Sequence, residues 1–226
     1  MHSKLLSIYN ILLQAYCLQK WWPTTNKGQI KPEYTGGPKN DKQRLEIAIG
    51  AILAQNTSWK NVEKAIENLN RGNLIDVEKL KKIPQKDLEE IIRPSGFFKQ
   101  KAERLKIFSE FIQSRKFENI TREGLLSLKG IGPETADSIL LYTCEKPEFV
   151  VDAYTKRIFS RIGLIKSEKY EEIKMFFQKN LPKNTKLYQE YHALIVEHAK
   201  KICKKEPECE GCPLLNMCLF GKTQRH

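Results

Sequence analysis

The sequence lacks a long hydrophobic run at its N-terminus. The apolar part of residues 1–22, MHSKLLSIYNILLQAYCLQKWW, is too short to span a bilayer. The segment also does not have the pattern of a signal peptide. The apolar residues there recur at helical spacing instead, at Leu5, Leu6, Tyr9, Leu12, Leu13 and Tyr16. These absences predict an intracellular, cytoplasmic protein that no segment anchors in a membrane.

The sequence also lacks convincing strands and internal repeats. Only EFVV at 148–151 resembles a short strand. Apolar residues elsewhere follow helical periodicity, which predicts an all-α protein with short loops. We expect further helices over 44–54, 58–69, 85–92, 99–113, 121–128, 134–143, 152–161, 168–178 and 186–202. One long segment, 23–41, is rich in Pro, Gly, Lys and Asn and is predicted to be a loop.

Acidic residues are in the minority. The 226 residues contain 39 Lys+Arg and 27 Asp+Glu, which leaves a formal net charge of +12. This excess favours a polyanionic partner, either nucleic acid or an acidic membrane surface. Charge alone does not choose between them.

Disulfides are not the first interpretation of the six cysteines, because intracellular thiols stay reduced. Four of them follow a C-x5-C-x2-C-x5-C pattern, at Cys203, Cys209, Cys212 and Cys218. Four thiols in one compact loop predict a metal centre. The loop suits a [4Fe–4S] cluster better than zinc, whose knuckles are commonly separated by a longer insert. Cys17 and Cys144 are expected in the core.

The stretch LKGIGPETADSIL, residues 128–140, predicts two helices joined by a tight bend. Thr121 is the expected N-cap of the first helix, and Pro133 suits the first position of the second. Gly130 and Gly132 permit positive φ and leave no Cβ in the way. The bend would present free backbone N–H groups, for which phosphate is a natural ligand. An ordinary turn between two helices is the alternative.

An aspartate begins the next helix, in FVVDAYTKRIFSRIGL. Asp152 is a natural N-cap, a structural role, but it follows an apolar segment that would partly desolvate its carboxylate near the glycine bend. Three basic residues follow and would supply positive charge, namely Lys156, Arg157 and Arg161. His192 and His198 show no evident partner and are expected to be packing or surface residues.

With these elements in this order, the chain resembles the helix-hairpin-helix DNA glycosylases of the endonuclease III superfamily. The resemblance rests on LKGIGPETA, VVDAYTKR, CKKEPECEGCPLLNMC and ILAQNTSW, and it covers nearly the whole chain. It implies two helical subdomains with the active site in the cleft between them. A six-helix barrel with the helix-hairpin-helix would span 39–145, while 1–38 and 146–226 would form a second subdomain carrying the iron–sulfur loop, 203–218.

The resemblance also implies a set of site residues. Asp152 would be catalytic, and Gln55 would enter the gap left by a flipped nucleotide in double-stranded DNA that contains a damaged base. Relatives hold a monovalent cation at the hairpin carbonyls, and the protein is expected to be a monomer. DNA-binding residues at the hairpin would be Lys129, Gly130, Ile131, Gly132 and Thr135. The 23–41 loop is either a mobile linker or a further DNA contact.

Two features of the chain depart from the family pattern. Bifunctional members carry a lysine where this chain has Glu134, and a carboxylate cannot form a Schiff base, so a monofunctional glycosylase with weak or absent lyase activity is expected. The first cysteine gap is one residue shorter than is typical of endonuclease III.

The lysines around the cysteine loop have two interpretations. They either contact the DNA backbone or form a solvated helix end, and they include Lys200, Lys201, Lys204 and Lys205.

The substrate expectation comes from the tryptophans. Trp21, Trp22 and Pro23 together with Trp59 resemble the branch that excises 3-methyladenine and related alkylated purines, which carry positive charge and suit an indole face. Burial against the N-terminal helix is the alternative for Trp21 and Trp22. The competing functions are a bifunctional glycosylase and lyase acting on oxidised pyrimidines, and a non-enzymatic metal-containing DNA-binding module.

Overall fold

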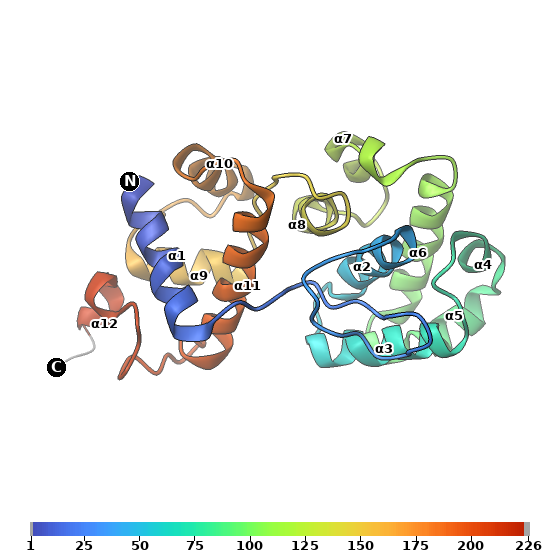
Figure 1. Cartoon of the computed structure of the whole chain (residues 1–226), viewed down its shortest axis with the longest axis horizontal. Coiled ribbons are helices and arrows are strands. Elements are labelled where there is room, and N and C mark those ends of the chain that lie inside the picture. The colour runs from blue at the N-terminus through green and yellow to red at the C-terminus, as the bar shows by residue number, and fades with distance from the viewer. Residues whose placement is uncertain (1, 224–226) are drawn as a thin grey trace. The chain divides into compact units, whose positions relative to one another are not determined.

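The computed structural model describes residues 2–223 and confirms the all-α class (Figure 1). Within these residues there is no strand, only an isolated bridge between Thr24 and Glu33. The chain divides into two compact units. Unit 1 combines the two ends of the chain, up to Gln19 and from Pro147 onward, and unit 2 is Lys20–Lys146.

Helix α2 is the central helix of unit 2. It is buried around nearly its whole circumference and packs against α3, α6, α8 and η3. The Asn40 side chain caps its start by accepting a hydrogen bond from the Gln43 amide at 3.0 Å. The elements of unit 2 are α2 Asp41–Leu53, α3 Trp59–Arg71, α4 Val77–Lys82, α5 Gln85–Ile91, η1 Arg93–Ser95, α6 Phe98–Ile112, η2 Phe117–Asn119, α7 Arg122–Leu126, α8 Pro133–Ser138 and the π-helical turn η3 Ile139–Thr143.

The 23–41 loop is fastened to unit 2. The amide and hydroxyl of Thr25 donate to Glu46 Oε1 at 3.0 and 2.7 Å, and Trp22 packs so closely on Gly50 that a Cβ there would lie 3.2 Å from its Nε1. Burial raises the pKa of Glu46 to about 7, although the Thr25 hydrogen bonds oppose the shift. Residues 20–38 therefore belong to unit 2, which corrects the domain boundary expected at residue 39.

Unit 1 is built around aromatic side chains. Phe149 stacks on Phe177 with ring centroids 4.1 Å apart, and the Tyr191 hydroxyl donates to the Leu5 carbonyl at 2.8 Å. The apolar segment before Asp152 is thus buried core rather than a strand. The elements of unit 1 are α1 His2–Tyr16, α9 Ala153–Ile162, α10 Tyr170–Asn180, α11 Thr185–Lys201, η4 Leu215–Met217 and α12 Leu219–Thr223.

The predicted helices are present, with differences where apolar signals are sparse. Helices α4 and α12 were not expected, because each is at most six residues long. The helix expected over 134–143 divides into α8 and η3. Cys144 is buried as expected, whereas Cys17 is exposed. None of the described helices has the length and apolar character needed to cross a membrane.

Candidate functional site

The glycine bend joins α7 to α8 at the surface of unit 2. The Thr121 hydroxyl accepts from the Gly124 amide at 3.1 Å, and Pro133 occupies the first turn of α8, as predicted. Gly130 has φ +85°, but Gly132 has φ −92°, which corrects the expectation of positive φ at both. Ile131 is 5% exposed and anchors the bend.

The bend is open to solvent on its outer side. Gly130 and Gly132 are exposed, and a Cβ built on Gly132 would meet nothing within 4 Å. Lys129 is also exposed and forms an ion pair of 2.8 Å with Glu103 of α6. Surface pairs of this kind contribute little stability, so the ammonium can exchange Glu103 for another anion.

The Gln55 side chain is hydrogen-bonded to the glycine bend and to the start of α8. Its Nε2 donates to the Gly130 carbonyl at 3.0 Å and to the Thr135 hydroxyl at 2.8 Å. Its Oε1 accepts from the guanidinium of Arg104 on α6. The structure thereby brings together three residues expected at the DNA-binding site. It adds Arg104, for which no motif in the sequence gave a signal.

Arg104 also explains the need for glycine at position 130. A Cβ there would lie 2.2 Å from Arg104 Nε, and the positive φ disfavours any L side chain. The arginine stem therefore covers one side of the bend while its guanidinium holds Gln55.

A buried lysine ties the end of α2 to the turn before α6. Lys101 is fully buried, and its Nζ donates to the carbonyls of Leu53 at 2.9 Å and Ser95 at 2.7 Å. Burial lowers the pKa of Lys101 to about 8, and the charge of Arg104 adds to the shift. Phe97 follows that turn, is 62% exposed and has φ 47°. The Lys101 ammonium therefore fixes both the segment that leads to Phe97 and the segment that leads to Gln55.

The tryptophans form one aromatic group in unit 2. Trp59 lies 4.7 Å from Trp21 and 5.2 Å from Trp22, as measured between ring centroids. Trp22 and Pro23 are buried, and Trp22 packs on Tyr142 with centroids 5.2 Å apart. Trp21 and Trp59 are half-buried. The structure therefore brings the three tryptophans together and leaves Trp21 and Trp59 as the partly exposed rings, while Trp22 and Pro23 are buried.

Asp152 is the N-cap of α9 and is 8% exposed. Its Oδ1 accepts from the amide and hydroxyl of Thr155 at 2.7 and 2.8 Å. Its Oδ2 lies 3.5 Å from His192 Nε2. Burial alone would raise the pKa of Asp152, but the interactions with His192 and Thr155 hold that pKa below its usual value. The carboxylate is thus anionic at neutral pH, and His192 has the partner that the sequence did not reveal.

The three basic residues after Asp152 bind other groups. Arg157 Nε donates to the Cys203 carbonyl at 2.9 Å, and Arg161 donates to Cys203 Sγ at 3.2 Å. Lys156 Nζ donates to the Glu168 carbonyl at 2.7 Å. The expectation that they supply charge to Asp152 is corrected, because helical spacing directs the two arginines to the cysteine loop.

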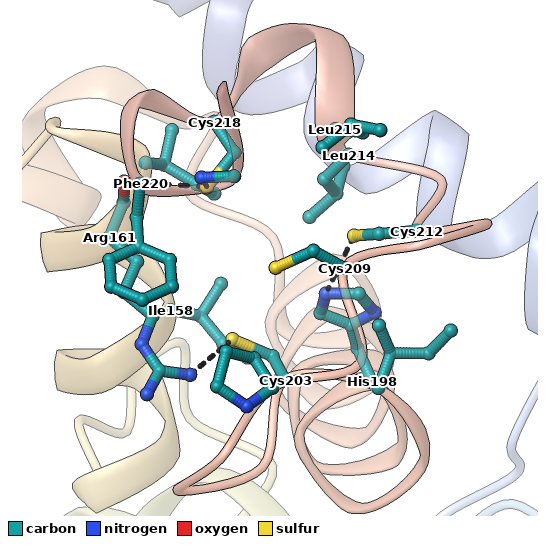
Figure 2. A pocket seen from close by; sticks show the side chains of 14 residues that line it. Ile158, Arg161, His198, Cys203, Cys209, Cys212, Leu214, Leu215, Cys218 and Phe220 are labelled. Atoms are coloured by element: carbon teal, nitrogen blue, oxygen red, sulfur yellow. Dashed lines mark hydrogen bonds between the residues drawn. The ribbon is translucent and has the colours of Figure 1, made fainter. Parts of the chain in front are cut away.

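The four cysteines of the terminal loop line one cavity in unit 1 (Figure 2). All four are free thiols, and the rest of the lining is mostly apolar, including Ile158, Leu214, Leu215 and Phe220. Within residues 2–223, no three His, Cys, Asp or Glu side chains are grouped so that they could hold a metal ion. The thiols surround a shared space rather than one point.

Polar contacts support the thiols. Cys218 Sγ accepts from the Gly221 amide at 3.3 Å, and His198 Nε2 lies 3.9 Å from Cys212 Sγ. His198 is a buried packing residue whose Nδ1 lies 2.8 Å from the Tyr16 hydroxyl. Burial and the neighbouring cysteines raise the pKa of the Cys212 thiol, and a bound metal cation would oppose that shift.

Comparisons with known proteins match this chain to DNA repair proteins. The family model described as HhH-GPD superfamily base excision DNA repair protein matches residues 49–183. A putative DNA repair glycosylase of Methanocaldococcus jannaschii is 47% identical over 224 residues, 94% of each chain. The endonuclease III of Thermotoga maritima is 34% identical and covers 83% of this chain and 89% of its own.

A solved structure extends the similarity to the fold. The crystal structure of the Helicobacter pylori 3-methyladenine DNA glycosylase bound to 1,N6-ethenoadenine superposes with a TM-score of 0.72 at 31% identity. It covers 88% of this chain and 97% of that chain.

Proposed function

Because the chain belongs to the HhH-GPD superfamily of base excision DNA repair proteins, we propose that it is a monofunctional DNA glycosylase that removes alkylated purines from double-stranded DNA. The placement of Asp152 carries this proposal: its buried carboxylate is fixed at the start of α9 by two hydrogen bonds from Thr155 and lies 3.5 Å from His192. A buried carboxylate held below its usual pKa is suited to stabilise the oxocarbenium-like sugar that forms as the base departs, or to orient water onto it.

Unit 2 would bind the DNA. The bend at the exposed Gly130 and Gly132 would receive a phosphate group, whereas the Ile131 amide already donates to the Leu128 carbonyl at 3.1 Å. Lys129 would add charge once it leaves Glu103. The target nucleotide must leave the stack before its glycosidic bond is accessible. Gln55 would then fill the vacancy, and Arg104, released from the Gln55 carboxamide, would be free to contact the strand.

Phe97 is a second candidate for opening the duplex. Apolar side chains often enter between base steps and unstack them, and Phe97 is exposed on a turn that Lys101 ties to the end of α2. The Gln55 segment begins directly after that helix. Two insertion residues on mutually braced segments would act together.

The absence of a lysine after the hairpin supports base release without strand cleavage. Glu134 is exposed at the position where bifunctional members carry the Schiff-base lysine. A carboxylate cannot form that covalent intermediate. Hydrolysis at Asp152 is then the reaction that the described residues support.

The aromatic group supports alkylated purines as substrates. Indole faces attract a cation more than a neutral ring, and N-alkylation places positive charge on the purine. The solved structure of the H. pylori enzyme, a 3-methyladenine DNA glycosylase by name, shows the fold bound to a modified adenine. A positively charged base is also a good leaving group, so strong general-acid assistance is not required.

Cys203, Cys209, Cys212 and Cys218 would hold a [4Fe–4S] cluster. The thiols fit this group because all four line a single, mostly apolar cavity. When bound, the cluster would fix the terminal loop against α9. Arg161 would donate to the Cys203 sulfur, and Arg157 would hold the backbone of the same residue.

The cluster proposal has a direct chemical test. Protein purified without oxygen is expected to be brown and to contain about four iron atoms per chain. Cys212→Ser should reduce the iron content markedly, while Cys144→Ser, a change at a cysteine outside the loop, should retain it. Stoichiometric zinc without iron would contradict the assignment.

A panel of lesion-bearing duplexes tests the proposed function. Release of free 3-methyladenine and 7-methylguanine, identified by mass spectrometry, is the expected result. Preferential release of oxidised pyrimidines would favour the bifunctional alternative. Binding without any base release would favour a non-enzymatic DNA-binding module.

A further inference from the structure

Glu63 on α3 lies against the aromatic group. The Trp59 indole N–H donates to Glu63 Oε1 at 2.8 Å, and the Tyr34 hydroxyl donates to the same oxygen at 3.5 Å. Trp21 completes the arrangement, with its ring 4.7 Å from Trp59 and 5.4 Å from Tyr34. We call these four residues the aromatic–carboxylate cluster.

The negative charge of Glu63 is not neutralised by a salt bridge. Within residues 2–223, no lysine or arginine forms an ion pair with Glu63, although Lys60 and Lys64 are close in sequence and the chain carries a net charge of +12. By contrast, Glu67, one turn further along α3, pairs with Arg71 at 3.9 Å. An unpaired carboxylate beside three aromatic rings is therefore a local feature of this cluster.

Such a cluster discriminates by charge. A neutral purine gains only stacking from the rings, whereas a cationic purine gains both the attraction of the ring quadrupoles and that of the carboxylate. Tyr34 is 45% exposed, and Trp21 and Trp59 are half-buried, so the rings remain reachable from solvent.

We infer that Glu63 is a specificity-determining residue that favours positively charged alkylated purines over neutral modified purines. This inference rests on the proposed function. It extends that function, because it assigns substrate choice to a carboxylate outside every motif by which the sequence resembles its family. Tyr34 would contribute by keeping the Glu63 carboxylate beside the rings.

The substitution Glu63→Gln tests the inference. Glutamine keeps an oxygen that can accept from the Trp59 indole and removes only the charge. Single-turnover excision is measured on duplexes containing 7-methylguanine, which is cationic, and 1,N6-ethenoadenine, which is neutral. The ratio of the cationic to the neutral rate is expected to fall about tenfold. Glu67→Gln, the matched control on α3, should leave the ratio unchanged.

Two outcomes would overturn the inference. An equal loss on both substrates would mean that Glu63 only orients Trp59, and unchanged rates on both would mean that it has no role in selection. Thermal unfolding of the variant, measured in parallel, shows whether an equal loss comes from misfolding.

A binding experiment separates this inference from the proposed function. If the wild-type protein releases no base, the proposed function fails, and the cluster is then tested by tryptophan fluorescence with two small probes. The 3,9-dimethyladeninium cation should bind the wild-type protein more tightly than neutral 9-methyladenine. Loss of that preference in Glu63→Gln supports charge selection, and an equal preference in both proteins contradicts it.

Discussion

Asp152→Asn is expected to slow base release by about 10³-fold while leaving affinity for duplex DNA within about twofold. The substitution removes the negative charge that would face the developing positive charge on the sugar. Asparagine is as good an N-cap as aspartate, so it can still accept from the Thr155 amide and hold the start of α9. Single-turnover excision and equilibrium DNA binding, measured on the same preparation, check both parts.

A second capping aspartate provides the control. Asp76 begins α4 and accepts from the Lys79 amide at 2.9 Å, which is the same local role in unit 2. Asp76→Asn should leave excision unchanged. Full turnover by Asp152→Asn would show that Asp152 acts only as a cap and would remove it from the reaction.

Gly132→Ala is expected to weaken duplex binding about 30-fold without loss of stability. The added methyl group would point into the open space where a phosphate would approach the bend. With φ −92° and no neighbour within 4 Å, alanine fits the folded chain at this position. Fluorescence anisotropy with a lesion-bearing duplex and thermal unfolding give the two measurements.

Gly130→Ala is the comparison variant for Gly132→Ala. At φ +85°, with a Cβ that would lie 2.2 Å from Arg104 Nε, alanine should lower both DNA affinity and the free energy of unfolding, the latter by about 1–2 kcal/mol. Wild-type affinity in Gly132→Ala would contradict the assignment of the bend as the phosphate site, whatever Gly130→Ala does.

Local sequence patterns predicted the features that depend on a few neighbouring residues. The helix periods, the Thr121 cap, Pro133 at the start of α8 and the spacing of the cysteines are each set by chemistry within a few positions. The same holds for Asp152 as the N-cap of α9. Local sequence patterns thus predict the backbone elements that carry the candidate site.

Side-chain partners distant in sequence could not be predicted in this way. Arg104 meets Gln55 across 49 positions and Tyr34 meets Glu63 across 29, and neither pair has a spacing signature. The contact between His192 and Asp152 depends on how α9 and α11 pack together. The family resemblance places residues 20–38 in the other subdomain, and no local pattern reveals the hydrogen bonds from Thr25 to Glu46 that hold them to unit 2.

The central claim is that this chain hydrolyses the bond between a damaged purine and its sugar and leaves the strand intact. One reaction tests it: excess protein is mixed with a duplex containing a single 7-methylguanine, and free base and strand breaks are followed together, with borohydride trapping in parallel. We predict stoichiometric base release, an unbroken strand until alkali is added and no covalent adduct. Strand breaks that keep pace with base release, together with a trapped protein–DNA adduct, would contradict the account.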